Sequence, residues 1–291
     1  PDPFDRTLYP DRLLDPSRQR ERVGVIHNEL PMSSALWRGG LGVLMSLQAI
    51  AVQGEIVIDR TRVIYPVTAR TVVVNLHNEA DGPRLVQAWI DDGDATAAPE
   101  NSDVPFTITP PIARMNAGTG RALRIMHDQT PKQVADRESV YWLNVLAIRP
   151  SVEASDETNA LQFAFRTRIK LFLRPAQLPG KAQDVVHALQ WCLSRGDDVG
   201  LEVLNPTAYH VTLSGVVLTL GGVEHHSEDP PMVAPYATAR VAIPELPSGD
   251  LSGPQLQFTT LDDDGATQHH QAQLQFVDCS SVKPYAAAPD A

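Results

Sequence analysis

The stretch LQFAFRTRIKLFLRP, residues 161–175, decides the fold class. Its odd positions from 161 to 173 are apolar except Thr167, and its even positions include four cations, Arg166, Arg168, Lys170 and Arg174. Successive side chains of a β-strand point to opposite faces, so this alternation predicts a long strand with one apolar face. The four cations stand out because the whole chain carries a net charge of −11.

Six further strand-like runs precede this stretch within roughly 120 residues. Turn-forming residues separate them, including the segment NEADGP at 78–83 and the loop 151–159. Seven short strands at this spacing predict an immunoglobulin-like β-sandwich. The six runs are EIVIDRTRVIYP (55–66), RTVVVNLHN (70–78), RLVQAWIDD (84–92), VPFTITPP (104–111), RALRIMHD (121–128) and VYWLNVLAI (140–148).

A second set of strands follows the connector RPAQLPGKAQ at 174–183, whose Pro and Gly residues indicate a domain boundary. Asp264 and Gly265 predict a tight hairpin turn between two of the later strands. We therefore expect an N-terminal domain at 52–175, a C-terminal β-sandwich at 176–280 and a tail at 281–291. Frequent Pro and Gly exclude a mainly helical alternative. The later runs are ALQWCLS, LEVLN, YHVTLSGVVLTL, ARVAIP, LQFTTL and AQLQFV.

The segment 32–51 has the three parts of a secretory signal peptide. Arg38 supplies the positive charge, an apolar block runs from 41 to 52, and Ala49-Ile50-Ala51 is a small-x-small cleavage pattern. A membrane anchor would need about 20 apolar residues, so we expect cleavage near Ala51 and no stable membrane insertion. Residues 1–31 are expected to be disordered or to be over-extended translation.

The composition is that of an ordinary globular protein, with 43% hydrophobic and 20% charged residues among 291. The negative net charge disfavours nucleic acid as a partner, because its phosphates would be repelled. We find no nucleophile elbow, P-loop, HExxH or dinucleotide-binding motif, so neither an enzyme nor a cofactor is indicated.

Metal binding is not indicated either. The two histidines within each pair, His225-His226 and His269-His270, would point to opposite faces of a strand and so cannot readily bind one ion together. The run 262–265 lacks the spacing of a calcium loop. Two cysteines, Cys192 and Cys279, are too few for a structural zinc site. Whether they form a disulfide or remain two buried thiols stays open.

Several short motifs in domain one, taken together, carry the clearest functional indication. They are DRTRV (59–63), TPP (109–111) with Arg114, DRES (136–139), YWLNV (141–145) and RIKLFLRP (168–175), and NPTAY (205–209) follows in domain two. In this order and spacing they resemble the PapD-like periplasmic chaperones of the chaperone–usher pilus pathway, from about residue 54 to 277. The short loop at 151–159 resembles that of the short-loop branch of the family.

This resemblance implies two immunoglobulin-like sandwiches in an L or boomerang arrangement with a cleft between them. It implies a non-catalytic periplasmic protein that binds pilus subunits by donor-strand complementation, with residues 159–173 as the donor strand. It also implies delivery of the subunit to an outer-membrane usher. The alternative is a secreted structural β-sandwich protein such as a pilus subunit or adhesin, which would have a single incomplete sandwich.

The resemblance also assigns site residues. Leu161, Phe163 and Phe165 match the apolar donor positions, and Arg62 and Lys170 match the anchor for the C-terminal carboxylate of the subunit. An ion-pair network between the domains corresponds to Glu138, Arg174 and Asp263. Without the resemblance, the donor residues would be read as core and the cations as ordinary surface charges. Lys170 differs in parity from the two phenylalanines, so we expect a bulge or strong twist near Thr167.

Overall fold

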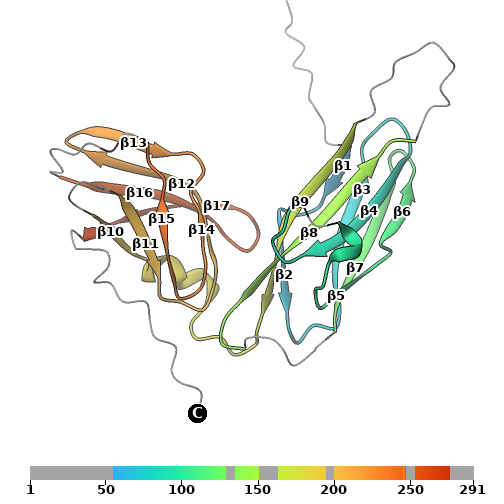
Figure 1. Cartoon of the computed structure of the whole chain (residues 1–291), viewed down its shortest axis with the longest axis horizontal. Helices are drawn as coiled ribbons and strands as arrows, with labels where there is room; N and C mark the ends of the chain where they lie inside the picture. Colours follow the sequence, from blue (N-terminus) through green and yellow to red (C-terminus); the bar gives the residue numbers. More distant parts are fainter. Residues whose placement is uncertain are drawn as a thin grey trace, which may run out of the picture. The chain divides into compact units, whose positions relative to one another are not determined.

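The computed structural model describes residues 55–96, 98–128, 135–150, 163–194, 200–244, 246 and 253–275. These residues form two β-sandwiches, and the predicted all-β fold of two immunoglobulin-like domains is confirmed (Figure 1). The expected signal segment, Leu161, Cys279 and the tail lie outside the described residues.

The N-terminal sandwich consists of a four-stranded and a five-stranded sheet. The first has the order β1 (Ile56–Ile58), β3 (Val72–Asn78), β7 (Gly120–His127), β5 (Phe106–Thr109). The second has the order β2 (Arg62–Pro66), β9 (Ala164–Arg174), β8 (Ser139–Ile148), β4 (Arg84–Asp91), β6 (Ile112–Met115). A short 3-10 helix, η1 (Pro99–Asn101), follows β4.

The C-terminal sandwich follows the 3-10 helix η2 (Ala182–Ala188). One sheet has the order β15 (Ala237–Val241), β11 (Leu201–Asn205), β10 (Gln190–Leu193), β18 (Leu274–Gln275). The other has the order β13 (Val223–Ser227), β12 (Val211–Leu220), β16 (Gln255–Leu261), β17 (Thr267–Ala272), and β14 (Met232–Val233) also pairs with β12.

Each sandwich has its own core of alternating apolar side chains. Tyr65 lies at the centre of the first, fully buried, where its hydroxyl donates to the Ala69 carbonyl and accepts from the His127 amide. Trp191 is buried in the core of the second sandwich and packs on Phe258. Cys192 is buried beside it and is disulfide-bonded.

The turn predicted at Asp264 and Gly265 is confirmed. Asp262 holds it, because its carbonyl accepts from the Gly265 amide and its carboxylate accepts from the amides of Asp264 and Ala266. Gly265 has φ +83°, a conformation that side chains other than glycine rarely adopt. A Cβ atom there would lie 2.0 Å from Thr61 Oγ1, so this hairpin tip contacts the start of β2.

Candidate functional site

Strand β9 is paired differently along its length. Its residues Ala164 to Leu173 pair antiparallel with β8 on one edge, in one continuous register. On the other edge β2 pairs in parallel, but only from Lys170 to Arg174. Among the described strands, none pairs with the second edge of residues 164–169. This half of β9 therefore offers an unpaired row of backbone amides and carbonyls.

The apolar face of β9 also changes character along the strand. Ile169, Leu171 and Leu173 are buried in the core of the N-terminal sandwich. Phe163 and Phe165 lie on the same face of the chain, but their exposed fractions are 60% and 54%. Two phenylalanine rings in water beside an unpaired strand edge indicate a binding surface, because soluble proteins seldom leave such groups uncovered without a partner.

Of the bulge or strong twist expected near Thr167, the bulge is wrong. The pairing of β9 with β8 shows no register shift, so the side chains alternate regularly from Ala164 to Arg174. Lys170 consequently faces the opposite side of the sheet from Phe165. Every residue of β9 from Ala164 to Leu173 has a partner in β8, so a bulge would break a ladder that is complete without it.

Arg62 and Lys170 are direct partners in the parallel ladder of β2 and β9, so both side chains lie on one face at the point where β2 begins. Arg62 is only 7% exposed, and its Nη1 donates to the Leu261 carbonyl at 3.0 Å, while its Nε has no hydrogen-bond partner. The Lys170 Nζ lies 5.6 Å from the centre of the Trp142 ring. Within the described part of the chain, neither cation forms an ion pair with a carboxylate.

The electrostatics of this pair favour an anion from outside. Burial lowers the pKa of Lys170, and the charge of Arg62 lowers it further, with Asp229 acting in the opposite direction. Burial likewise lowers the pKa of Arg62, although Asp263 and Asp262 raise it in part. Two adjacent, partly desolvated cations repel each other, so a carboxylate placed between them would stabilise both.

The three residues expected in the ion-pair network lie together. Arg174 Nε donates to Glu138 Oε1 at 2.6 Å, and its Nη1 and Nη2 donate to the Asp263 carboxylate at 2.7 and 2.8 Å. Glu138 also accepts from the His210 amide at 2.8 Å. These hydrogen bonds join side chains of the first sandwich to backbone and side chains of the second. Residues of both sandwiches line a cavity of about 560 Å³ beside Arg62.

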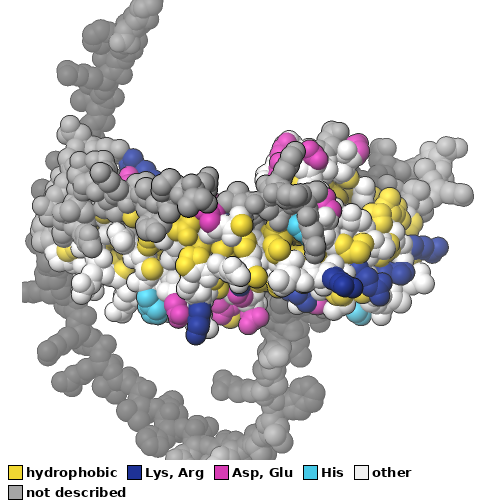
Figure 2. All heavy atoms as spheres, turned by 90° about the horizontal axis from the view of Figure 1, so that it is seen from below, with side chains coloured by type: hydrophobic (Ala, Val, Ile, Leu, Met, Phe, Trp, Pro, Cys, Tyr) yellow, Lys and Arg dark blue, Asp and Glu magenta, His cyan; other side chains and the backbone are white. Residues whose placement is uncertain are grey.

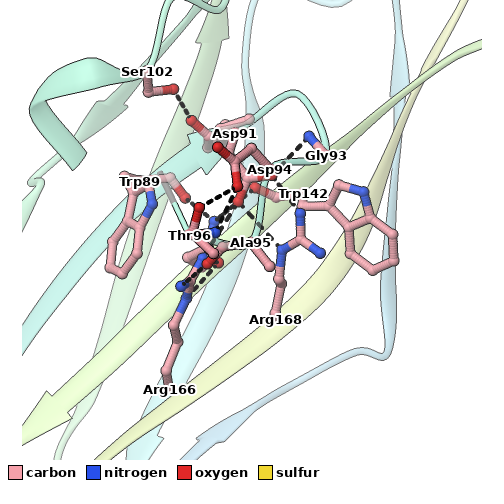
Figure 3. Close-up of polar contacts among 12 residues, drawn as sticks. Trp89, Asp91, Gly93, Asp94, Ala95, Thr96, Ser102, Trp142, Arg166 and Arg168 are labelled. Atoms are coloured by element: carbon pink, nitrogen blue, oxygen red, sulfur yellow. Dashed lines mark hydrogen bonds and ion pairs between the residues drawn. The ribbon is translucent and has the colours of Figure 1, made fainter. Parts of the chain in front are cut away.

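A second polar cluster was missed by sequence reasoning. Asp91 is 1% exposed and is held by Arg168, Arg166 and Asn144 on the face of the sheet opposite to Phe165 (Figure 3). The sequence shows the cations Arg166 and Arg168 at alternate positions, but nothing in it pairs them with a carboxylate some 75 residues earlier. The only available signal was the position of Asp91, the first of three aspartates (Asp91, Asp92 and Asp94), directly at the end of an apolar run.

The charges are unevenly divided between the two sandwiches. Residues 55–180 contain 14 Lys and Arg against 15 Asp and Glu, whereas residues 181–291 contain 4 against 14. On the face drawn in Figure 2, Lys and Arg side chains gather at the right-hand end. The paired cations Arg62 and Lys170 thus belong to a domain of nearly balanced charge, in which an incoming carboxylate meets little net repulsion.

The described residues contain no group of three or more His, Cys, Asp or Glu side chains that could hold a metal ion. His270, from one of the two histidine pairs considered for metal binding, has its Nε2 2.9 Å from the hydroxyl of Thr260. No helix in the described ranges is long and apolar enough to cross a membrane.

The fold and the site together define a class of protein: two immunoglobulin-like sandwiches, of which the first presents an unpaired edge strand with exposed aromatic side chains. Comparison with known families identifies this class. Residues 55–179 match the N-terminal domain of PapD, described as a pili and flagellar-assembly chaperone, and residues 184–272 match the C-terminal domain of the pili assembly chaperone PapD. The chain belongs to this family of pilus-assembly chaperones, and the alternative of a pilus subunit or adhesin is wrong.

Individual relatives agree with the family match. The chain is 38% identical over 223 residues to the probable fimbrial chaperone YadV of Escherichia coli K12, which covers 76% of this chain and 90% of YadV. It is 37% identical over 249 residues to the chaperone protein FimB/FhaD of Bordetella pertussis, and the match covers 82% of this chain and 99% of that protein. The crystal structure of the YadV chaperone matches with a TM-score of 0.65 at 36% identity, and the match covers 75% of this chain and 99% of that chain.

A structure described as Salmonella enterica SafA pilin in complex with the SafB chaperone matches with a TM-score of 0.58 at 25% identity. The match covers 75% of this chain and 96% of that chain.

Proposed function

We propose that this chain is a periplasmic chaperone that binds pilus subunits through residues 164–169, the free half of β9. This segment would act as a donor strand that pairs with the sheet of the subunit. The observation that carries the proposal is the combination, in residues 163–169, of an unpaired edge and an exposed aromatic face. A subunit whose sandwich lacks a strand has the complementary defect, an open edge beside an apolar groove. Adding an extended strand to such an edge supplies backbone hydrogen bonds, and alternate side chains fill the groove.

The direction of the bound strand follows from the boundary of the free edge at Lys170 and from the position of Phe163 and Phe165 before it. β2 occupies this edge of β9 from Lys170 onward, so a guest strand on the edge must end where β2 begins. Arg62 and Lys170 lie at that point and suit a terminal carboxylate. A guest strand that ends at Lys170 and extends back toward Phe163 runs in the same direction as β9. The proposal is therefore a parallel addition, fixed in register by the chain end.

The two phenylalanines supply the apolar part of the binding free energy. Burying an exposed Phe side chain contributes about 1.5–3 kcal/mol, against which the entropic cost of association must be set. The same rings imply a subunit with roomy pockets at the matching positions. Leu161, which lies outside the described residues, is proposed as a third donor residue, as the resemblance implies.

The wider assignments are proposed with the same function. The complex of SafA pilin with the SafB chaperone supports a pilus subunit as the partner, and the family supports delivery to an outer-membrane usher. Residues 32–51 are proposed as a signal peptide cleaved near Ala51, which fits a periplasmic location. Glu138, Arg174 and Asp263 are proposed to hold the two domains together, and the domain boundary is placed near residue 175.

The test is co-purification of a pilus subunit with the chaperone from the periplasm, with both proteins co-expressed. Lys170→Glu places a negative charge where the carboxylate would bind, so we expect a folded protein that no longer retains the subunit. The matched control is Arg121→Glu, the same charge change at an exposed position on β7 in the other sheet. Undiminished co-purification with Lys170→Glu would contradict the anchor assignment.

A further inference from the structure

The free half of β9 faces a physical difficulty. A strand that pairs on one edge only and buries neither Phe163 nor Phe165 has little to hold it in place, and such segments open locally at low free-energy cost. A strand that must be lent to another sandwich nevertheless binds best if it is already extended, because ordering it during association would reduce the affinity.

The face opposite to the phenylalanines carries a dense set of contacts that hold this half of β9. The Asp91 carboxylate, at the end of β4, accepts from Arg168 Nη2 at 2.5 Å and from Arg168 Nε at 3.2 Å. Asn144, on β8 and fully buried, donates to the same carboxylate at 2.7 Å. A single carboxylate thus joins β9 to β4 across the intervening strand β8.

Arg166 adds a second set of links from β9. Its Nε and Nη2 donate to Asn144 Oδ1 at 2.8 and 2.6 Å, and its Nη1 donates to the Ala95 carbonyl at 2.6 Å. The loop that supplies Ala95 is itself fixed, since the Asp91 carboxylate accepts from the Gly93 amide at 2.8 Å. The free half of β9 is therefore connected to two strands and to the loop after β4.

Two indole rings complete the arrangement. The Arg166 guanidinium lies 4.8 Å from the centre of the Trp89 ring, and the Arg168 guanidinium lies 4.1 Å from the centre of the Trp142 ring. Figure 3 shows the two arginines reaching from β9 toward Asp91, with the indoles on either side. Contacts of a guanidinium with an indole face are attractive and restrict the arginine side chain.

We propose that Asp91, Asn144, Arg166 and Arg168 form a clamp that holds the donor half of β9 extended before a subunit arrives. The inference rests on the proposed function and deepens it, because it assigns positioning residues to the lending of the strand. The clamp acts from the face opposite to Phe165, so it leaves both the aromatic face and the free edge open to the guest.

The placement of the links supports a positioning role over general stabilisation. Both arginines of the clamp lie in the segment that β2 leaves unpaired, and the half from Lys170 onward is held by β2 instead. Another buried ion pair of the same sandwich, Arg84 with Glu55 at 2.7 Å, does not involve β9. That pair gives a comparison in the same sandwich, because Arg84→Gln also removes an arginine from a buried carboxylate, although Glu55 keeps its second partner, Arg149.

The experiment measures amide hydrogen exchange in the free full-length chaperone, for wild type, Asp91→Asn, Arg168→Lys and Arg84→Gln. We expect Asp91→Asn to accelerate exchange of the amides in 164–169 that bond to β8 by at least about tenfold, since charge-assisted hydrogen bonds of a buried group are lost. Arg168→Lys keeps the charge but loses the two-pronged contact, so we expect a smaller acceleration of the same segment. Arg84→Gln should leave the exchange rates of residues 164–169 unchanged, with the rates of β3 and β7 in the same protein as the reference.

Unchanged exchange at 164–169 in Asp91→Asn would overturn the clamp, and so would an equal acceleration there in Arg84→Gln. If Asp91→Asn does not fold, Arg168→Lys decides by the same criterion. The measurement needs no subunit, so its result is independent of the proposed function. With a subunit present, a slower association rate for Arg168→Lys is expected, and an unaltered rate would show that the clamp does not serve binding.

Discussion

The two halves of β9 are one continuous strand in one register with β8, yet they have opposite surroundings. From Lys170 to Leu173 the strand is paired on both edges, because β2 occupies the second one; Leu171 and Leu173 lie in the core, and Phe172 packs on His210 of the second sandwich. From Ala164 to Ile169 the second edge is free, and Phe165 is exposed beside it.

The difference shows how one strand can serve both folding and binding. The covered half fixes β9 in the protein, and the free half keeps its hydrogen-bonding groups and its aromatic side chains available. The boundary between the halves is the pair formed by Arg62 and Lys170, two cations without a carboxylate partner among the described residues. We infer that the boundary determines where a guest strand stops.

The largest expected effect comes from changing the free half. Phe163→Glu with Phe165→Glu puts charges on side chains that are exposed in the free protein and that the proposed complex would bury. We expect wild-type stability and loss of subunit capture by more than about a hundredfold, because burying an unpaired carboxylate in an apolar groove is costly. Thermal unfolding and pull-down of the subunit measure the two quantities.

The contrasting change is Leu171→Ala in the covered half, where we expect the free energy of unfolding to fall by about 2–5 kcal/mol and the folded fraction to keep its affinity. A double Glu variant that still captures the subunit would remove the functional distinction between the halves.

An intermediate effect is expected for the network at the end of the covered half. The Glu138 side chain is 2% exposed, so Glu138→Gln removes the buried carboxylate from Arg174, which keeps its bonds to Asp263, and should lower stability by about 1–3 kcal/mol. The Asp263 side chain is 46% exposed, and Asp263→Asn should cost less than about 1 kcal/mol. Urea unfolding of the two variants measures the difference, and equal losses would contradict the assigned burial.

The smallest effect concerns pH and the free half. Burial alone would raise the pKa of Asp91, but hydrogen bonds from Arg168, Asn144 and the Gly93 amide outweigh it and lower the pKa. The stability that Asp91 contributes is therefore complete above its unfolded pKa of about 3.9 and is lost as the pH falls through the lower folded value. Wild type should be more stable than Asp91→Asn at pH 6, and this gap should narrow toward pH 2.

Urea unfolding at a series of pH values measures this gap. Other carboxylates titrate in both proteins and cancel in the comparison. A gap that stays constant down to pH 2 would show that Asp91 has the same pKa in the folded and unfolded states.

Much of the fold was predictable, because alternation in β3, β7 and β9 reports directly which face of each strand is apolar. The same pattern placed Phe163 and Phe165 on one face and Lys170 on the other. It did not reveal that the apolar face is exposed at Phe165 and buried at Leu171, because exposure depends on which strands lie opposite. That distinction came from the family resemblance.

The clamp was not predictable for a related reason. Asp91 and Arg168 lie 77 positions apart, and only the order of β4, β8 and β9 in the sheet brings them together. The bulge expected near Thr167 is absent, because Lys170 and the phenylalanines do not lie on one face of the sheet and β9 needs no irregularity to bring them there. The regular ladder shows that Arg62 and Lys170 lie on the opposite face from Phe165.

Amide hydrogen exchange with and without bound subunit measures directly whether the free half of β9 is the part that pairs with the subunit. We expect amides directed to the free edge within 164–169 to gain strong protection on binding, while those of 170–174, already paired with β2, change little. Unchanged exchange at 164–169 in a verified complex would contradict this expectation, since the subunit would then be bound elsewhere.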